Sequence, residues 1–120
     1  EVEELDRLRQ RGFPVFAAPS MSVMSIAFIT ERERPSPLQD VRVRRALNYA
    51  VDKEAIARVL LRGLGRASGQ PAPRVAFGHD PALAPYPYDP GRARRLLAEA
   101  GYPDGFALTA EIQINAIPAD

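Results

Sequence analysis

The sequence predicts an α/β fold in which a small mixed sheet of three or more strands packs against amphipathic helices. Three short apolar or alternating segments have the pattern of strands, and they cover residues 13–18, 23–29 and 106–114. Three longer segments repeat apolar residues at helical spacing, and they cover residues 41–51, 53–62 and 90–100. With 120 residues the chain is long enough for one domain.

Composition places the chain among ordinary globular proteins. Hydrophobic residues make up 46% and charged residues 26%, with a formal net charge of +1. The net charge therefore selects no partner. The absence of cysteine excludes disulfides, thiolate metal sites and cysteine nucleophiles. No apolar run reaches the ~18 residues of a membrane span, and residues 1–5 are no signal peptide, so we expect any export signal to lie outside this chain.

The first elements are a short helix and two strands. Residues 2–11 can form a helix that Gly12 ends, and since no cap residue precedes it we interpret it as the tail of a longer element. The segments 13–18 and 23–29 flank a turn at Pro19-Ser20. Both faces of 23–29 are apolar or small, which predicts a strand buried on both sides. Residues 30–39 are a polar, proline-broken loop.

Two helices follow, each with an aspartate at its start. Asp40 precedes a helix whose apolar stripe is Val43, Ala46, Leu47, Ala50 and Val51. Asp52 begins the next helix, with Glu54 in its first turn, and Gly63 or Gly65 ends it. Its stripe is Ala55, Ile56, Val59 and Leu60.

The rest of the chain is a long loop, a helix and a strand. Residues 62–88 are rich in glycine and proline and predict an ordered, irregular surface loop. Asp89-Pro90 begins a helix, and Gly101 ends it. Its apolar stripe is Ala93, Leu96, Leu97 and Ala100. Residues 106–114 then alternate as a strand with one wet face.

Three stretches carry a resemblance to a known family. They are S-I-A-F-I-T followed by P-S-P-L-Q-D, the helix pair V-R-V-R-R-A-L-N-Y-A-V-D-K-E-A-I, and Y-P-Y-D-P-G-R-A-R-R-L-L-A-E-A-G-Y-P-D-G-F-A-L-T. In this order and spacing they resemble the bacterial extracellular solute-binding proteins of the peptide/nickel (oligopeptide/dipeptide) type, which serve ABC importers. The resemblance covers about four fifths of the chain. It departs from the family at Ile29-Thr30, where an asparagine is common, and at Pro37-Leu38, where an aromatic residue is common.

The resemblance implies a function and a location. Family members close two lobes around a solute and present it to membrane permease subunits, so we expect this chain to be a piece of one lobe, a single partial domain over residues 1–120. The implied solute is a peptide or a related small molecule. The implied location is periplasmic or extracytoplasmic, with any lipoprotein anchor encoded outside these residues. We expect no enzyme activity and no cofactor, and we nominate no ligand-binding, catalytic or metal residues.

We interpret the candidate metal-binding and catalytic residues as surface residues. His79 is the only histidine and has no second histidine or cysteine to share a metal or form a triad. The acid pairs Glu3/Glu4 and Glu31/Glu33 lie in polar segments where nothing raises a carboxyl pKa. Tyr86 and Tyr88 lie in the proline-rich loop, where they either stack on a ligand or pin the loop to its own lobe; we favour pinning.

The alternative function is nucleic-acid binding. The helix pair 41–62 carries five arginines and could form a helix-turn-helix-like module. They are Arg42, Arg44, Arg45, Arg58 and Arg62. Against this reading, Val51-Asp52 leaves almost no turn between the helices, and acidic residues balance the charge. We therefore expect no nucleic-acid partner.

The same patterns predict burial and self-association. We expect four apolar side chains to be almost fully buried, namely Leu47, Ile56, Leu96 and Leu97, and three arginines to be exposed, namely Arg44, Arg94 and Arg95. We also expect the chain by itself to self-associate through segments 23–29 and 106–114, because unpaired strands recruit other strands.

Overall fold

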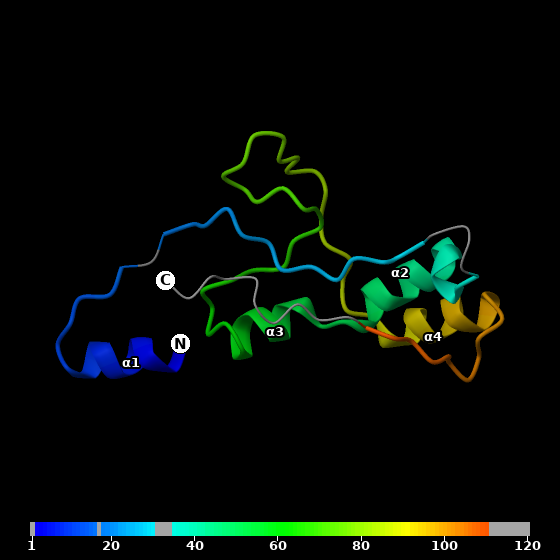
Figure 1. Cartoon of the computed structure of the whole chain (residues 1–120), viewed down its shortest axis with the longest axis horizontal. Coiled ribbons are helices and arrows are strands. Elements are labelled where there is room, and N and C mark those ends of the chain that lie inside the picture. Colours follow the sequence, from blue (N-terminus) through cyan, green and yellow to red (C-terminus); the bar gives the residue numbers. More distant parts are fainter. Residues whose placement is uncertain (1, 17, 31–34, 111–120) are drawn as a thin grey trace.

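The computed structural model describes residues 2–16, 18–30 and 35–110, and within these ranges it contains helices and no strand. Figure 1 shows their arrangement. The elements in chain order are α1 (Val2–Gln10), the 3₁₀ turn η1 (Pro37–Gln39), α2 (Val41–Ala50), α3 (Lys53–Val59) and α4 (Pro90–Glu99).

The core lies between α2 and α4, which pack side by side (Figure 1). Ala46 of α2 and Ala93 of α4 are buried at this contact together with Tyr49, and their small side chains let the two backbones approach closely. Val43 of α2 is also fully buried, and η1, with its buried Leu38, packs against α2. The packed unit of the described chain is therefore a helix pair with a 3₁₀ lid.

The three predicted N-caps are confirmed. In each case a carboxylate oxygen accepts a hydrogen bond from a backbone N–H in the first turn of the helix. Asp40 caps α2 through Arg42 N at 2.7 Å, Asp52 caps α3 through Ala55 N at 2.8 Å, and Asp89 caps α4 through Arg92 N at 2.8 Å. Local sequence thus determines where these helices begin. The predicted end of the second helix is wrong, because α3 ends at Val59 and not at residue 62, where the backbone has φ +47°.

The end of α4 is also as predicted. Gly101 has φ +90°, a left-handed conformation that residues with a Cβ rarely adopt. Its N–H donates to Ala98 O at 3.0 Å, and the N–H of Tyr102 donates to Leu97 O at 2.8 Å. These are the two bonds of a Schellman motif, which satisfy carbonyls that the helix leaves free. The helix therefore ends at Gly101, as the sequence predicts.

The predicted sheet is not present among the described residues. Residues 13–16 and 18–30 have no ladder partner, and several of their large side chains face solvent, with Phe16 91%, Met24 84% and Ile26 79% exposed. The prediction that 23–29 is buried on both sides is therefore wrong for this structure. Residues 106–110 form no strand, and 111–114 lie outside the described residues. A strand needs a neighbour for its backbone groups, and no described segment supplies one.

The burial predictions for the four apolar side chains are wrong. Leu47, Leu96 and Leu97 are only half-buried, and Ile56 is 39% exposed. The physical reason is that α2 turns Tyr49 rather than Leu47 onto α4, while α3 packs on no other helix of the described chain.

The exposure predicted for the three arginines is confirmed for two of them. Arg94 and Arg95 are exposed as expected. Arg44 is half-buried, because its guanidinium donates to Leu38 O at 2.8 Å and Gln39 O at 2.9 Å. It holds η1 onto α2 rather than forming part of a solvated face.

Candidate functional site

An aromatic cluster fastens the loop before α4 to the end of α2. The ring of Tyr49, only 7% exposed, meets the ring of Tyr86 edge-to-face, with centroids 5.0 Å apart and planes at 85°. The guanidinium carbon of Arg92 lies 4.5 Å from the centroid of the Tyr49 ring. Both geometries are attractive, through the ring quadrupole in one case and a cation–π contact in the other. With Lys53 and Asp89, these residues form what we call the tyrosine joint.

Backbone bonding completes the contact between α2 and α4 at this joint. The N–H of Asp89 donates to Tyr49 O at 2.9 Å. The side chain of the same aspartate caps α4. One residue therefore fixes both the start of α4 and its distance from the end of α2.

Lys53 links a third segment to the joint. Its ammonium donates to Asn48 O at 2.6 Å and to Tyr86 O at 3.5 Å. Burial lowers the pKa of Lys53, because the charged form loses water contacts. Since a cation near a helix C-terminus is favourable, the interaction with Asn48 O also stabilises the last turn of α2. Lys53 thus ties α2, the start of α3 and the loop together.

The tyrosine joint clamps one end of the helix pair, and Arg42 forms a second clamp at the opposite end. Arg42 pairs with Asp40 at 2.6 Å and donates to Glu99 O, at the end of α4, also at 2.6 Å. The hydrogen bond from Arg42 lowers the pKa of Asp40, and the same bond raises the pKa of Arg42. The two clamps hold α2 and α4 together at both ends.

The chemistry of these two clamps is that of a scaffold. Across the described ranges, every buried side-chain nitrogen or oxygen has a hydrogen-bond partner. In the tyrosine joint, Lys53 donates to two backbone carbonyls, the Asp89 carboxylate accepts from the N–H of Arg92, and the Arg92 guanidinium lies over the Tyr49 ring.

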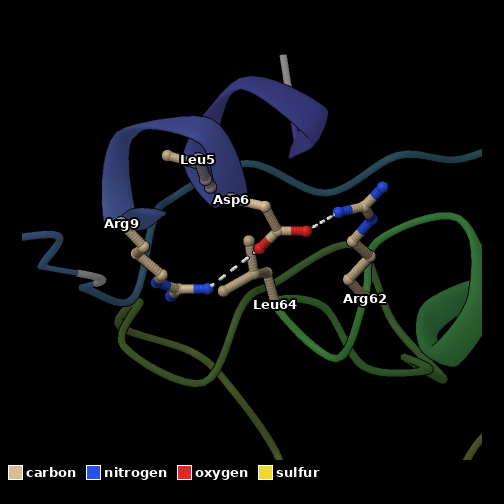
Figure 2. Close-up of a pocket in the computed structure, with 5 residues that line it drawn as sticks. All are labelled: Leu5, Asp6, Arg9, Arg62 and Leu64. Carbon is tan, nitrogen blue, oxygen red and sulfur yellow. Dashed lines mark hydrogen bonds and ion pairs between the residues drawn. The ribbon is translucent and has the colours of Figure 1, made fainter. Parts of the chain in front are cut away.

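The structure also contains a small hollow between α1 and the turn after α3. Figure 2 shows its lining residues, with the Asp6 carboxylate between the guanidinium groups of Arg9 and Arg62. Arg9 lies 3.4 Å from Asp6, and Arg62 pairs with the same carboxylate. Leu5 and Leu64 supply the apolar wall, and the cavity volume is about 70 Å³. Solute pockets are usually of roughly 300–1,000 Å³, so this hollow is a contact between segments rather than a binding site.

The candidate chemical residues of the sequence lie apart from one another. The Nδ1 atom of His79 lies 2.9 Å from Ala72 O, inside its own loop. Glu4 pairs with Arg7 at 3.4 Å on the exposed face of α1. The side chain of Glu3, together with Glu31 and Glu33, lies outside the described residues. In the part of the chain that is described, no three His, Cys, Asp or Glu residues gather as a metal site would require.

The two loop tyrosines behave differently. Tyr86 pins the loop to α2 through Tyr49, as expected. Tyr88 is 54% exposed and does not join the cluster. Sequence reasoning missed Tyr49 itself, although it continues the buried series Val43 and Ala46 at three-residue spacing. That spacing is the signal that could have identified it.

The helix-turn-helix alternative gains no support from the structure. Such a module needs its two helices packed together across a turn, with the second free to enter a groove. Here α2 packs against α4 and not against α3. Arg42 and Arg44 bond to backbone carbonyls of Glu99 and Leu38, and so are used within the fold.

Within the described residues, none of the helices combines the length and the apolar character that crossing a bilayer requires.

Comparison with known proteins gives a consistent result. A sequence model described as "Bacterial extracellular solute-binding proteins, family 5 Middle" matches residues 2–118. Heme-binding protein A of Haemophilus influenzae is 45% identical over 93 residues, which cover 78% of this chain. Glutathione-binding protein GsiB is 37% identical in Salmonella choleraesuis and 36% identical in Escherichia coli K12, over 103 residues and 84% of this chain.

The matched regions are a minor part of those relatives. The alignment covers 16% of the Haemophilus protein and 19% of the Salmonella and Escherichia proteins. The chain thus spans less than a fifth of the length of these curated relatives.

Proposed function

This chain belongs to the family 5 bacterial extracellular solute-binding proteins, and from that membership we propose that it forms part of one lobe of the substrate-binding component of an ABC importer. The whole protein would capture a solute between two lobes and deliver it to the permease subunits. The observation that carries the proposal is the family match over residues 2–118. The family consists of α/β binding proteins rather than enzymes, and its location outside the cytoplasm makes a periplasmic or other extracytoplasmic site our proposal for this protein.

We propose peptides and related small solutes as the ligand class. Two of the similar proteins are named for binding heme and glutathione, and glutathione is itself a short peptide. The choice among these ligands rests on parts of the protein that line the cleft. We propose that the α2–α4 pair is a rigid part of the lobe and does not contact the ligand, because its polar groups hold the helices and the adjoining loop together.

The proposed role of this segment is therefore mechanical. A lobe that closes on a ligand must move as a rigid body, and two clamps at opposite ends of α2 and α4 provide that rigidity. In this proposal, the partner strands for segment 23–29, which pairs with no other described segment, come from the rest of a longer protein.

The test is ligand binding by the full-length protein that carries this chain. Calorimetry should be run with a mixed library of di- to pentapeptides, with glutathione and with hemin. We expect micromolar or tighter binding of a peptide or glutathione and no chemical change in the ligand. The 120-residue chain by itself should bind weakly or not at all, because a solute site buries its ligand from both sides. Failure to bind any of these ligands, or turnover of one, would refute the proposal.

A further inference from the structure

The loop between α3 and α4 is closed at its base by a narrow neck. Gly69 lies directly against the backbone of Ala84, so that a Cβ at Gly69 would lie 2.6 Å from Ala84 O. One step further in, the side-chain amide of Gln70 donates to Asp80 O at 2.6 Å and accepts from Asp80 N at 3.0 Å. These contacts join residues that are ten or more positions apart. Figure 1 shows the loop projecting away from the α2–α4 pair.

Further bonds order the loop beyond the neck. The Nδ1 atom of His79 lies 2.9 Å from Ala72 O, and Ala76 N donates to Pro73 O at 2.8 Å in a turn at the tip. Gly78 has φ +87°, which reverses the chain immediately after Phe77. The tip is therefore shaped by bonds within the loop and does not depend on packing against the helices.

Phe77 stands on this ordered tip without cover. Its exposure is 106% of the reference value, the highest of the large apolar side chains in the described residues. Large aromatic residues on pre-ordered loops are the usual anchors of interfaces, because they bury much apolar area while little conformational entropy remains to be lost. A single exposed leucine would need no explanation, but a fully exposed phenylalanine on a bonded loop does.

From these contacts we infer that the loop 69–84 is a docking arm whose Phe77 inserts into an apolar hollow formed by the rest of the same solute-binding protein. This inference rests on the proposed function, which makes the chain part of a longer protein. The relatives are more than five times longer than the matched region, so most of the surface available to the arm lies in sequence outside this chain. The rest of the same protein is also a partner that is always present, so it would keep Phe77 covered at all times.

The shape of the tip argues against direct recognition of the solute. Solute sites are concave and cover their ligand from several sides. Phe77 is a projection with no neighbouring wall, which fits into a hollow and does not form one. Arg74, exposed on the preceding turn of the same loop, serves as an internal comparison, since it should stay in solvent when Phe77 is covered.

Thiol labelling of the full-length protein tests the inference, and this chain contributes no cysteine of its own. Phe77→Cys and Arg74→Cys are compared, without solute, by following modification of the loop peptide by mass spectrometry. We expect labelling at position 77 to be slower than at position 74 by roughly tenfold or more, the factor that about 1.4 kcal/mol of protection gives. Adding Gly69→Ala, which forces the neck apart, should bring the rate at position 77 close to that at position 74.

Two outcomes would overturn the inference while leaving the proposed function intact. Rapid labelling at position 77 that slows only when a bound peptide or glutathione is present would make Phe77 a solute contact. Rapid labelling in both states would leave the tip in solvent or free for the permease. As a second measurement, Phe77→Ala should increase hydrogen exchange in residues 70–80 while Phe77→Leu largely preserves the wild-type rate; equal rates in all three proteins would also contradict docking.

Discussion

Replacing Tyr49 by alanine should loosen α4 from α2 more than any other single substitution in the pair. Tyr49 is 7% exposed, meets the ring of Tyr86 edge-to-face and lies beneath the guanidinium of Arg92. Truncation removes both contacts and leaves a cavity between the helices. Tyr49→Phe is the matched control, because it keeps the ring and both of its contacts.

The expected loss follows from these contacts. An edge-to-face aromatic pair contributes about 0.5–1.5 kcal/mol beyond its buried area. An exposed cation–π contact adds about 0.5–1 kcal/mol. Burial of the ring and the residual cavity bring large aromatic-to-alanine substitutions to about 3–5 kcal/mol in total. Because Arg92 remains exposed, we expect Tyr49→Ala to fall near the lower end, at about 3 kcal/mol of local opening free energy.

Hydrogen exchange of the full-length protein, followed by mass spectrometry, measures this loss. The N–H of Asp89 donates to Tyr49 O at 2.9 Å, and Ala93 N donates to Asp89 O at 3.0 Å, so both amides report on the joint. A loss of about 3 kcal/mol corresponds to roughly 100-fold faster exchange at these amides. Tyr49→Phe should change the rate by less than about threefold. If Tyr49→Ala exchanges as slowly as the wild type, or Tyr49→Phe as fast as Tyr49→Ala, the ring contacts do not hold the helices together.

Three further predictions follow from the packing and charge of the described residues. Leu97→Ala should lower the free energy of opening α4 by only about 1–2 kcal/mol, less than the 2–5 kcal/mol of a fully buried leucine, because Leu97 is half-buried. A decrease above about 3 kcal/mol would show that more of the protein covers it. The pKa of Asp40 is lowered in the folded state, so its stabilising effect is complete above the ordinary aspartate pKa of about 3.9 and disappears as pH falls through the lowered value. Stability curves of the wild type and Asp40→Asn, measured by circular dichroism during acid titration, should therefore converge in acid and separate above it; a constant gap would contradict this assignment. The 120-residue chain by itself should self-associate with rising concentration in light scattering, because Phe16, Met24 and Ile26 are exposed, and a monomer at every concentration would refute this expectation.

The family, the starts of the capped helices and the end of α4 could be predicted from local sequence. Asp40, Asp52 and Asp89 each cap a helix through a backbone N–H two or three residues ahead, and Gly101 ends α4 through bonds to the residues just before it. These interactions span only a few residues, so their outcome does not depend on the rest of the fold. The motif order that resembled the solute-binding family is likewise a property of sequence alone, and the family match confirms it.

The sheet could not be predicted in this way, because a strand is defined by its neighbour. Apolar alternation in 23–29 shows that the segment suits a sheet, but pairing needs a second strand at the right register and distance. Within the described residues no such partner is present, and the side chains of Met24 and Ile26 remain in solvent.

The tyrosine joint was decided by tertiary structure. Periodicity placed Leu47 on the buried stripe of α2, but the start of α4 and the loop at Tyr86 approach the side of α2 that carries Ala46 and Tyr49. Tyr49 is therefore buried, and Leu47 is only half-buried. Which side of a helix becomes core depends on where a segment some forty residues away comes to lie, and helical periodicity carries no information about that position. Sequence alone determined where α2, α3 and α4 begin and where α4 ends; only the packing of α4 on α2 decided which side chains hold these two helices together.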